Sequence, residues 1–169
     1  GAFEAGRAGE ALVGLFALLP AVVDAVGDKV PVVATGGIAD ARGIAAALVL
    51  GASAVQIGTG LLRTPEAKIA PAWADAIGNA QPEDTVATRA FSGRLGRSIA
   101  TAYVKAANAP DAPSPAPYPV QRGLSQAMRD AGTKAGDIDR MQAWAGQSAR
   151  LAPAEPAAEL CRWRHHGPV

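Results

Sequence analysis

The chain has 169 residues, of which 49% are hydrophobic and 18% are charged, and its formal net charge is +1. This length suffices for one domain with a hydrophobic core. The balanced charge, without a long run of one sign, argues against a nucleic-acid or anionic-membrane partner. No apolar stretch is long enough to span a bilayer and no signal-like segment opens the chain, so we expect a cytoplasmic protein.

The first half of the chain alternates between helical and strand patterns. Apolar residues at helical spacing are interrupted by Pro20, which favours a helix that starts close to it. Asp40 is a suitable N-cap for the helix that follows the first strand. The expected elements are helices at about 19–26, 40–50 and 65–77 and strands at 31–35 and 54–57. Short buried strands that alternate with helices predict parallel βαβ units and an α/β fold.

The second half, after Gly78, is less regular. Four prolines in residues 108–118 predict an extended connector. A short strand is expected at 86–91 and helices at 98–107, 121–131 and 140–152. We therefore divide the chain into an α/β part (1–80), a smaller and mostly helical lobe with the connector (81–120), a helical part (121–160) and a tail (161–169).

Two glycine-rich turns follow the two predicted strands. Gly36-Gly37-Ile38 comes after the first strand, and Gly58-Thr59-Gly60 comes after the second. Glycine lets backbone N–H groups approach a phosphate closely, and a helix N-terminus adds a favourable dipole. Thr59 adds a hydroxyl and Gln56 an amide. Two such turns in consecutive units predict one shared anion site; the alternative is that the glycines only permit tight turns.

Other side chains give weaker indications. Cys161 is the single cysteine, and His165 and His166 are the only histidines, without an acidic or cysteine cluster beside them, so we expect no metal site. Arg94 and Arg97 are either a clamp for a substrate carboxylate or a surface pair. Trp144 is expected to pack at the mouth of the substrate site or in the core. These three residues are candidate substrate contacts.

The glycine turns and their surroundings resemble the nitronate monooxygenase (2-nitropropane dioxygenase-like) family, carboxy-terminal half. The matches include Pro31–Asp40 (PVVATGGIAD) and Gly51–Thr59 (GASAVQIGT). The Gly-Gly-Ile turn alone is shared with other phosphate-binding barrels, and its combination with Glu-Ala-Gly and Ala-Gly-Gln is more specific. Further matches are Glu4-Ala5-Gly6, Gly43–Leu48, Ser92-Gly93-Arg94 with Arg97, Tyr118-Pro119 and Trp144-Ala145-Gly146-Gln147.

The resemblance implies a flavoenzyme built on a (β/α)8 TIM barrel, of which this chain supplies the carboxy-terminal strands. A complete barrel needs about 250 residues. It further implies FMN-dependent oxidation of alkyl nitronates, such as propionate 3-nitronate, with O2. The segment from about 81 to 119 would then be the substrate-side lobe, and the helices after it would return to the barrel. The residues implied to contact FMN are Gly6, Gly36, Gly37, Gln56, Ile57, Gly58 and Thr59.

The catalytic base is where the chain departs from the family. The family has a histidine soon after the position of Gly6, whereas this chain continues Arg7-Ala8-Gly9-Glu10, so no catalytic residue is assigned. Either the base has been lost or a loop is missing from the printed sequence, and we favour the missing loop. We interpret the chain as part of a longer product that pairs with its amino-terminal half or with another copy.

Two other functions fit the same residues. A flavin-dependent enoyl reductase would share the barrel and the Gly-Gly-Ile turn but would need a nicotinamide coenzyme. A non-catalytic remnant would bind flavin or phosphate without turnover.

Overall fold

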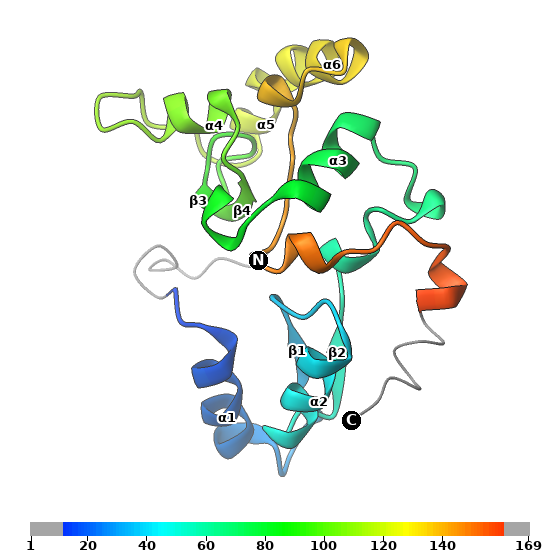
Figure 1. Cartoon of the computed structure of the whole chain (residues 1–169). Helices are drawn as coiled ribbons and strands as arrows, with labels where there is room; N and C mark the ends of the chain where they lie inside the picture. The colour runs from blue at the N-terminus through cyan, green and yellow to red at the C-terminus, as the bar shows by residue number, and fades with distance from the viewer. Residues whose placement is uncertain (1–11, 161–169) are drawn as a thin grey trace.

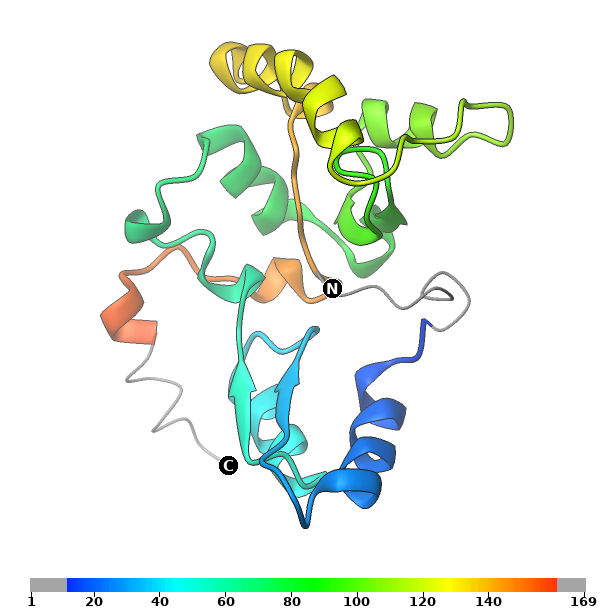
Figure 2. The ribbon, with the colours of Figure 1, turned by 180° about the vertical axis from the view of Figure 1, so that it is seen from behind.

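The computed structural model describes residues 12–160, and these form two groups of elements. The first group lies at one end of the molecule and the second at the other, as Figures 1 and 2 show from opposite sides. The first group contains α1 (Leu15–Val26), β1 (Val33–Thr35), α2 (Ala41–Val49) and β2 (Ala54–Gln56). The second contains α3 (Pro71–Asn79), β3 (Thr85–Thr88), β4 (Gly96–Ile99), α4 (Ala102–Ala107), α5 (Val120–Leu124) and α6 (Gln126–Ala135).

The first group is a βαβ unit, which confirms the predicted α/β fold. β1 and β2 pair in parallel, with Val33 opposite Ala54 and Thr35 opposite Gln56. Their crossover is α2, whose N-cap Asp40 accepts a hydrogen bond from the Gly43 N–H. The buried core consists of Leu19, Ala34, Ile38, Ala47 and Ala52. Because both strands point the same way, the turns that follow them meet at one edge of the sheet.

The second group is organised by an antiparallel hairpin. β3 pairs with β4, with Thr85 opposite Ile99 and Thr88 opposite Gly96. Helices α4, α5 and α6 lie beside this hairpin at the upper end of Figure 1. The smaller lobe is thus built on strands as well as helices, and the expectation that it is mostly helical is wrong.

After α6 the chain returns toward the first group. It pairs with β4 through an antiparallel bridge between Ser98 and Trp144. Ile99 donates its N–H to the Ala143 carbonyl at 2.9 Å, and Ala145 donates to the Arg97 carbonyl at 3.1 Å. This return segment (residues 141–148) is the orange stretch of chain that runs down from the second group toward the first in Figure 1. It links the hairpin physically to the turns after β1 and β2.

The return segment corrects one prediction. A helix was expected over 140–152, but residues 141–148 carry no helix, and the adjoining elements are single 3₁₀ turns at Ile138–Arg140 and Ala149–Leu151. Met141, Ala143 and Ala145 are buried and the residues between them are half-buried. That alternation has the period of a strand, and pairing with β4 satisfies its backbone. Pairing with the open edge of β4 therefore gives the return segment its extended conformation.

Other boundaries also differ. α1 begins at Leu15 and contains Pro20, because packing of its apolar face on the core outweighs the lost backbone hydrogen bond. The helix expected over 65–77 is split, since Lys68 adopts a left-handed conformation with φ 51° and α3 begins only at Pro71. The helix expected over 98–107 begins at Ala102, because Ser98 and Ile99 complete β4.

Some residues named in the sequence analysis, one implied flavin contact and the candidate metal ligands, lie outside the described part of the chain. Gly6, Cys161 and the pair His165 and His166 are not among residues 12–160. Within that range, no helix has the length and apolar character needed to cross a membrane. The proposed division into four segments stays a prediction.

Replacing Asp40 with alanine is expected to lower the free energy of unfolding by about 1 kcal/mol at neutral pH, because α2 loses its N-cap. Burial raises the pKa of Asp40, but hydrogen bonds from Arg42 and from the Gly43 N–H outweigh it, so the pKa lies below its ordinary value.

The ionised carboxylate therefore contributes stability above its unfolded-state pKa, and this contribution is lost as the pH falls through the lower folded-state pKa. Urea unfolding between pH 2 and pH 7 measures it, with Asp40→Asn as the control that keeps an acceptor oxygen without the charge. An identical pH dependence in the wild type and in Asp40→Asn would contradict this account.

Candidate functional site

The turns after β1 and β2 line a common cavity of about 140 Å³. Gly36 and Gly37 form one wall, and both have positive φ angles, 97° and 71°, which a side chain would strain. Gly58 and Thr59 form the second wall. The parallel pairing of β1 with β2 brings these turns together, as the sequence predicted.

A third wall comes from the return segment and was not predicted. Gly146 donates its N–H to the Thr59 hydroxyl oxygen at 3.0 Å. Ser148 donates its hydroxyl to the Gly37 carbonyl at 2.5 Å. Both residues line the cavity, although more than 80 positions separate each of them from its partner. We call this three-walled cavity the cradle. Its third wall is the Gly146-Gln147-Ser148 turn, and no local feature of that sequence predicts a contact with Thr59.

The cradle is open at the positions where glycine leaves space. A Cβ atom built on Gly36 or Gly58 would meet no other atom within 4 Å, and one on Gly37 would meet only the Ser148 hydroxyl, at 4.0 Å. The glycines therefore do more than permit close packing, since a side chain would fill the space that the cradle encloses. Backbone N–H groups and the Thr59 hydroxyl form the donors of the polar lining, a set that suits a phosphate group, whereas the Ser148 hydroxyl proton is donated to the Gly37 carbonyl.

The electrostatics of the cradle rest on neutral dipoles. None of the described residues that line it carries a charge. The N-terminus of α2 is partly satisfied already, because Asp40 accepts from Gly43. The turn after β2 leads into a 3₁₀ turn, Thr59–Leu61, rather than into an α-helix. The helix dipole expected from the sequence therefore contributes less to anion binding at the cradle than the backbone and hydroxyl hydrogen-bond donors do.

Other residues implied to contact the cofactor lie beside the cradle. Gln56 ends β2, where its carbonyl accepts from the Thr35 hydroxyl, and its side chain is exposed. Ile57 packs against the core of the βαβ unit. Neither lines the cradle, and Gly6 lies outside the described residues.

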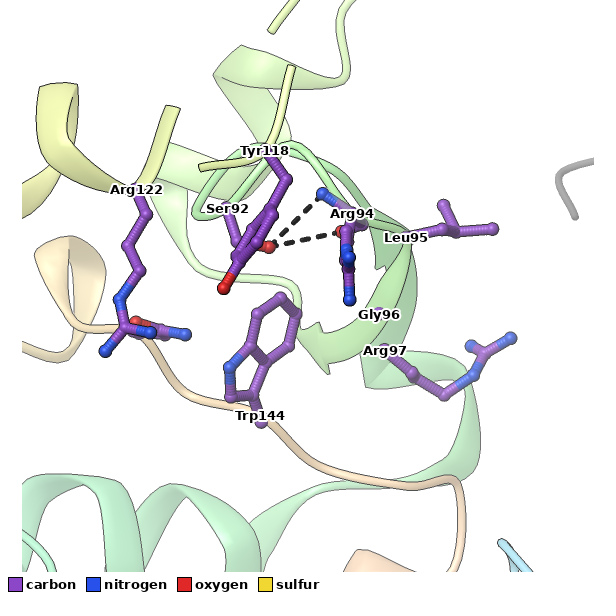
Figure 3. Close-up of a pocket in the computed structure, with 9 residues that line it drawn as sticks. Ser92, Arg94, Leu95, Gly96, Arg97, Tyr118, Arg122 and Trp144 are labelled. Carbon is purple, nitrogen blue, oxygen red and sulfur yellow. Dashed lines mark hydrogen bonds between the residues drawn. The ribbon is translucent and has the colours of Figure 1, made fainter. Parts of the chain in front are cut away.

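A second and larger cavity, of about 460 Å³, lies against the hairpin. We call it the cleft. Trp144 lines one side of it, and Figure 3 shows the hydroxyl end of Tyr118 directed toward the Trp144 ring. The Arg94 guanidinium stacks on the Tyr118 ring, 4.2 Å from the ring centre. Its lining also includes Ser92, Leu95, Gly96, Arg97, Arg122 and Gln142.

The cleft has a cationic lining with a rigid aromatic wall. None of the described lining residues is acidic. Trp144 is fixed by an edge contact with Phe91, at 5.4 Å between ring centres, and by a hydrogen bond from Trp73 to its carbonyl. The guanidinium groups of the predicted pair Arg94 and Arg97 diverge: Arg97 contributes to the lining, but its guanidinium donates to the Thr85 carbonyl and is directed away from Arg94 and Trp144 in Figure 3.

The cradle and the cleft are neighbours along the return segment. Trp144 lines the cleft and Gly146 lines the cradle. Two extended residues span about 7 Å, so the sites adjoin. Fold and site together define an α/β protein that holds a small-molecule site on the turns after its parallel strands, with a cationic cleft beside it.

Comparison with known proteins identifies the family. A family model described as nitronate monooxygenase matches residues 1–162, so the chain belongs to the nitronate monooxygenase family, a family of oxidoreductases. A probable nitronate monooxygenase of Staphylococcus aureus (strain Newman) is 40% identical over 146 residues, which are 86% of this chain and 40% of the relative. The resemblance stated from the sequence is confirmed.

Solved structures agree with this assignment. The nitroalkane oxidase from Streptomyces ansochromogenes superimposes with a TM-score of 0.87 at 37% identity, over 96% of this chain and 46% of that one. FabK from Thermotoga maritima gives a TM-score of 0.71 at 32% identity, over 89% and 47%. The chain thus spans less than half the length of these relatives.

Replacing Gly58 with valine is expected to fill the cradle and abolish binding of inorganic phosphate while leaving the fold intact, because the new side chain enters open space. Isothermal titration calorimetry with phosphate tests the loss of binding, and thermal unfolding tests whether the fold stays intact. The matched control is Gly123→Ala, also at a glycine with no atom within 4 Å of a built Cβ, but away from the cradle. Unchanged phosphate binding by Gly58→Val would exclude the cradle as the phosphate site.

Proposed function

We propose that the protein to which this chain belongs oxidises alkyl nitronates with O2, using FMN whose phosphate lies in the cradle. The observation that carries the proposal is the three-walled cradle directly beside a cleft that suits an anion. The family and the nitroalkane oxidase structure support a flavin in general, and the cradle supports one with a terminal phosphate.

The cradle residues fit a phosphate monoester. The cavity of about 140 Å³ is lined by backbone amides, by Thr59 and by Ser148. Thr59 accepts from Gly146, which leaves its own hydroxyl proton to donate to a phosphate oxygen. Gly36, Gly37 and Gly58 let that phosphate approach the backbone, so these residues hold and orient the cofactor. When bound, the flavin supplies electron transfer from the nitronate to O2.

The substrate is proposed to be a nitronate rather than a neutral nitroalkane. A neutral nitroalkane must lose a proton from carbon before oxidation, which needs a general base. A nitronate is already the deprotonated anion and needs no base. A cationic cleft favours that anion directly.

The two parallel strands are proposed to be part of a (β/α)8 barrel that the full-length polypeptide completes. Val33 on β1 is 52% exposed and Phe16 on α1 is 74% exposed. Apolar side chains and a strand edge left open in this way call for partners. The relatives are more than twice as long as the matched region, which leaves enough chain for further strands. The occupant proposed for this edge is therefore another segment of the same polypeptide.

The full-length protein is expected to carry a flavin absorption band and to take up O2 when propionate 3-nitronate is added. Oxidation of NADH with an enoyl thioester, in the absence of O2 uptake with nitronates, would instead establish the enoyl reductase alternative. Bound flavin without either activity would establish the non-catalytic one. Gly58→Val is expected to lose both the flavin band and O2 uptake, because the phosphate has no cradle.

A further inference from the structure

Arg129 on α6 is a buried cation that hydrogen-bonds only neutral acceptors among the described residues. Its side chain is 9% exposed. It donates to the Ser125 hydroxyl at 3.1 Å, to the Arg122 carbonyl at 3.0 Å and to the Gln126 side-chain oxygen at 2.6 Å. A fourth hydrogen bond, at 2.5 Å, goes to the Gln142 side-chain oxygen. Burying a guanidinium without a carboxylate partner is costly, so this arrangement calls for a reason.

Arg129 fixes which end of the Gln142 amide faces the cleft. A guanidinium has only donors, so Gln142 must present its oxygen, Oε1, to Arg129. The Nε2 group is then directed to the other side. Gln142 lines the cleft, and no acceptor within residues 12–160 takes its amide protons. Arg129 thus turns a donor toward the cavity.

Two more donors face the cleft without protein acceptors. Within the described part of the chain, neither the Arg122 guanidinium nor the Trp144 indole N–H has a hydrogen-bond acceptor, and both residues line the cleft. Figure 3 shows the nitrogen edge of Trp144 turned to the side from which Arg122 approaches. Three donor groups from α5 and the return segment therefore converge, and the described lining holds no acidic side chain to satisfy them.

The charges also favour an anion at this point. Burial and the positive charge of Arg122 lower the pKa of Arg129 from its ordinary value, and the nearby Asp130 and Tyr103 offset this only in part. Arg129 remains protonated at any physiological pH. An anion held between Arg122 and Gln142 would reduce the repulsion between the two guanidinium groups.

We propose that Arg122, the Gln142 amide and the Trp144 indole N–H form a subsite for a carboxylate at the far end of the nitronate substrate, with Arg129 as the residue that positions Gln142. The inference rests on the proposed function and deepens it, since it assigns substrate selection to the cleft. The cavity of about 460 Å³ accommodates a small acyclic dianion. The nitronate end of that dianion lies toward the cradle, which adjoins the cleft at Gly146.

Succinate is the binding probe, because a carboxylate matches a nitronate in planarity and charge but cannot be oxidised by the same route. Titration of the full-length, flavin-loaded protein is expected to show binding of succinate and much weaker binding of its monomethyl ester. Arg122→Ala should weaken succinate binding roughly 10- to 100-fold, the loss expected for charge-assisted hydrogen bonds. The matched control is Arg140→Ala, which removes the same charge from an exposed ion pair with Asp137. Equal affinity in the wild type and Arg122→Ala would overturn the subsite.

Gln142→Glu separates binding from folding. The new carboxylate still accepts from Arg129, so the melting temperature is expected to stay the same or to rise. The cleft, however, loses its amide donors and gains a negative charge, and succinate binding should fall more than tenfold. Retained succinate binding in Gln142→Glu would show that Gln142 is structural only and would overturn its role.

Enzyme kinetics test the carboxylate subsite separately from the proposed nitronate oxidation. In Arg122→Ala, kcat/KM for propionate 3-nitronate is expected to fall in proportion to succinate affinity, and to fall at least tenfold more than kcat/KM for ethylnitronate, which has no carboxylate. Equal losses for both nitronates would overturn the subsite but leave nitronate oxidation standing. Absence of O2 uptake with either nitronate in the wild type would overturn the proposed function, and succinate binding would still decide the subsite. Binding of NADH that depends on Arg122, in place of succinate, would overturn the carboxylate assignment.

Discussion

The hydrogen bond from the Gly146 N–H to the Thr59 hydroxyl is the constraint on which the site depends. It joins the return segment to the turn after β2, and the bond from Ser148 to Gly37 repeats the connection at the turn after β1. The same segment is paired with β4 two residues earlier. The return segment therefore connects the hairpin group to the βαβ unit, with the cradle at the turns of the βαβ unit and the cleft against the hairpin.

The two cavities differ in their electrostatics. The cradle uses neutral backbone and hydroxyl donors, which lie at fixed positions and need little rearrangement to hold a phosphate. The cleft places guanidinium groups beside aromatic rings, a lining that would attract and orient the anion of the proposed function. Trp144 forms a fixed wall of the cleft because its backbone pairs with β4 and its ring packs on Phe91. A rigid wall of this kind suits a site that must align two ligands.

Local sequence patterns predicted the βαβ unit well and the second group poorly. β1, α2 and β2 are specified by short-range features: β-branched runs, the Asp40 cap and glycines that need positive φ. The 140–152 region failed because alanine-rich sequence has helical propensity, whereas the open edge of β4 offered its backbone long-range partners. The separation of the Arg94 and Arg97 guanidinium groups could not be read from the sequence either, since it follows from the hydrogen bond of Arg97 to the Thr85 carbonyl and from the stacking of Arg94 on Tyr118.

The sequence by itself determined the family, the parallel strands and the two glycine turns, because each depends on residues close together in the chain. Only the tertiary structure decided that Gly146 and Ser148 close the cradle, and that Arg122, Gln142 and Trp144 share one cleft. Those partners lie far apart in sequence, and no local periodicity encodes the distance between them. The orientation of the Gln142 amide is the clearest case, since it follows from a hydrogen bond with a buried arginine on a different element.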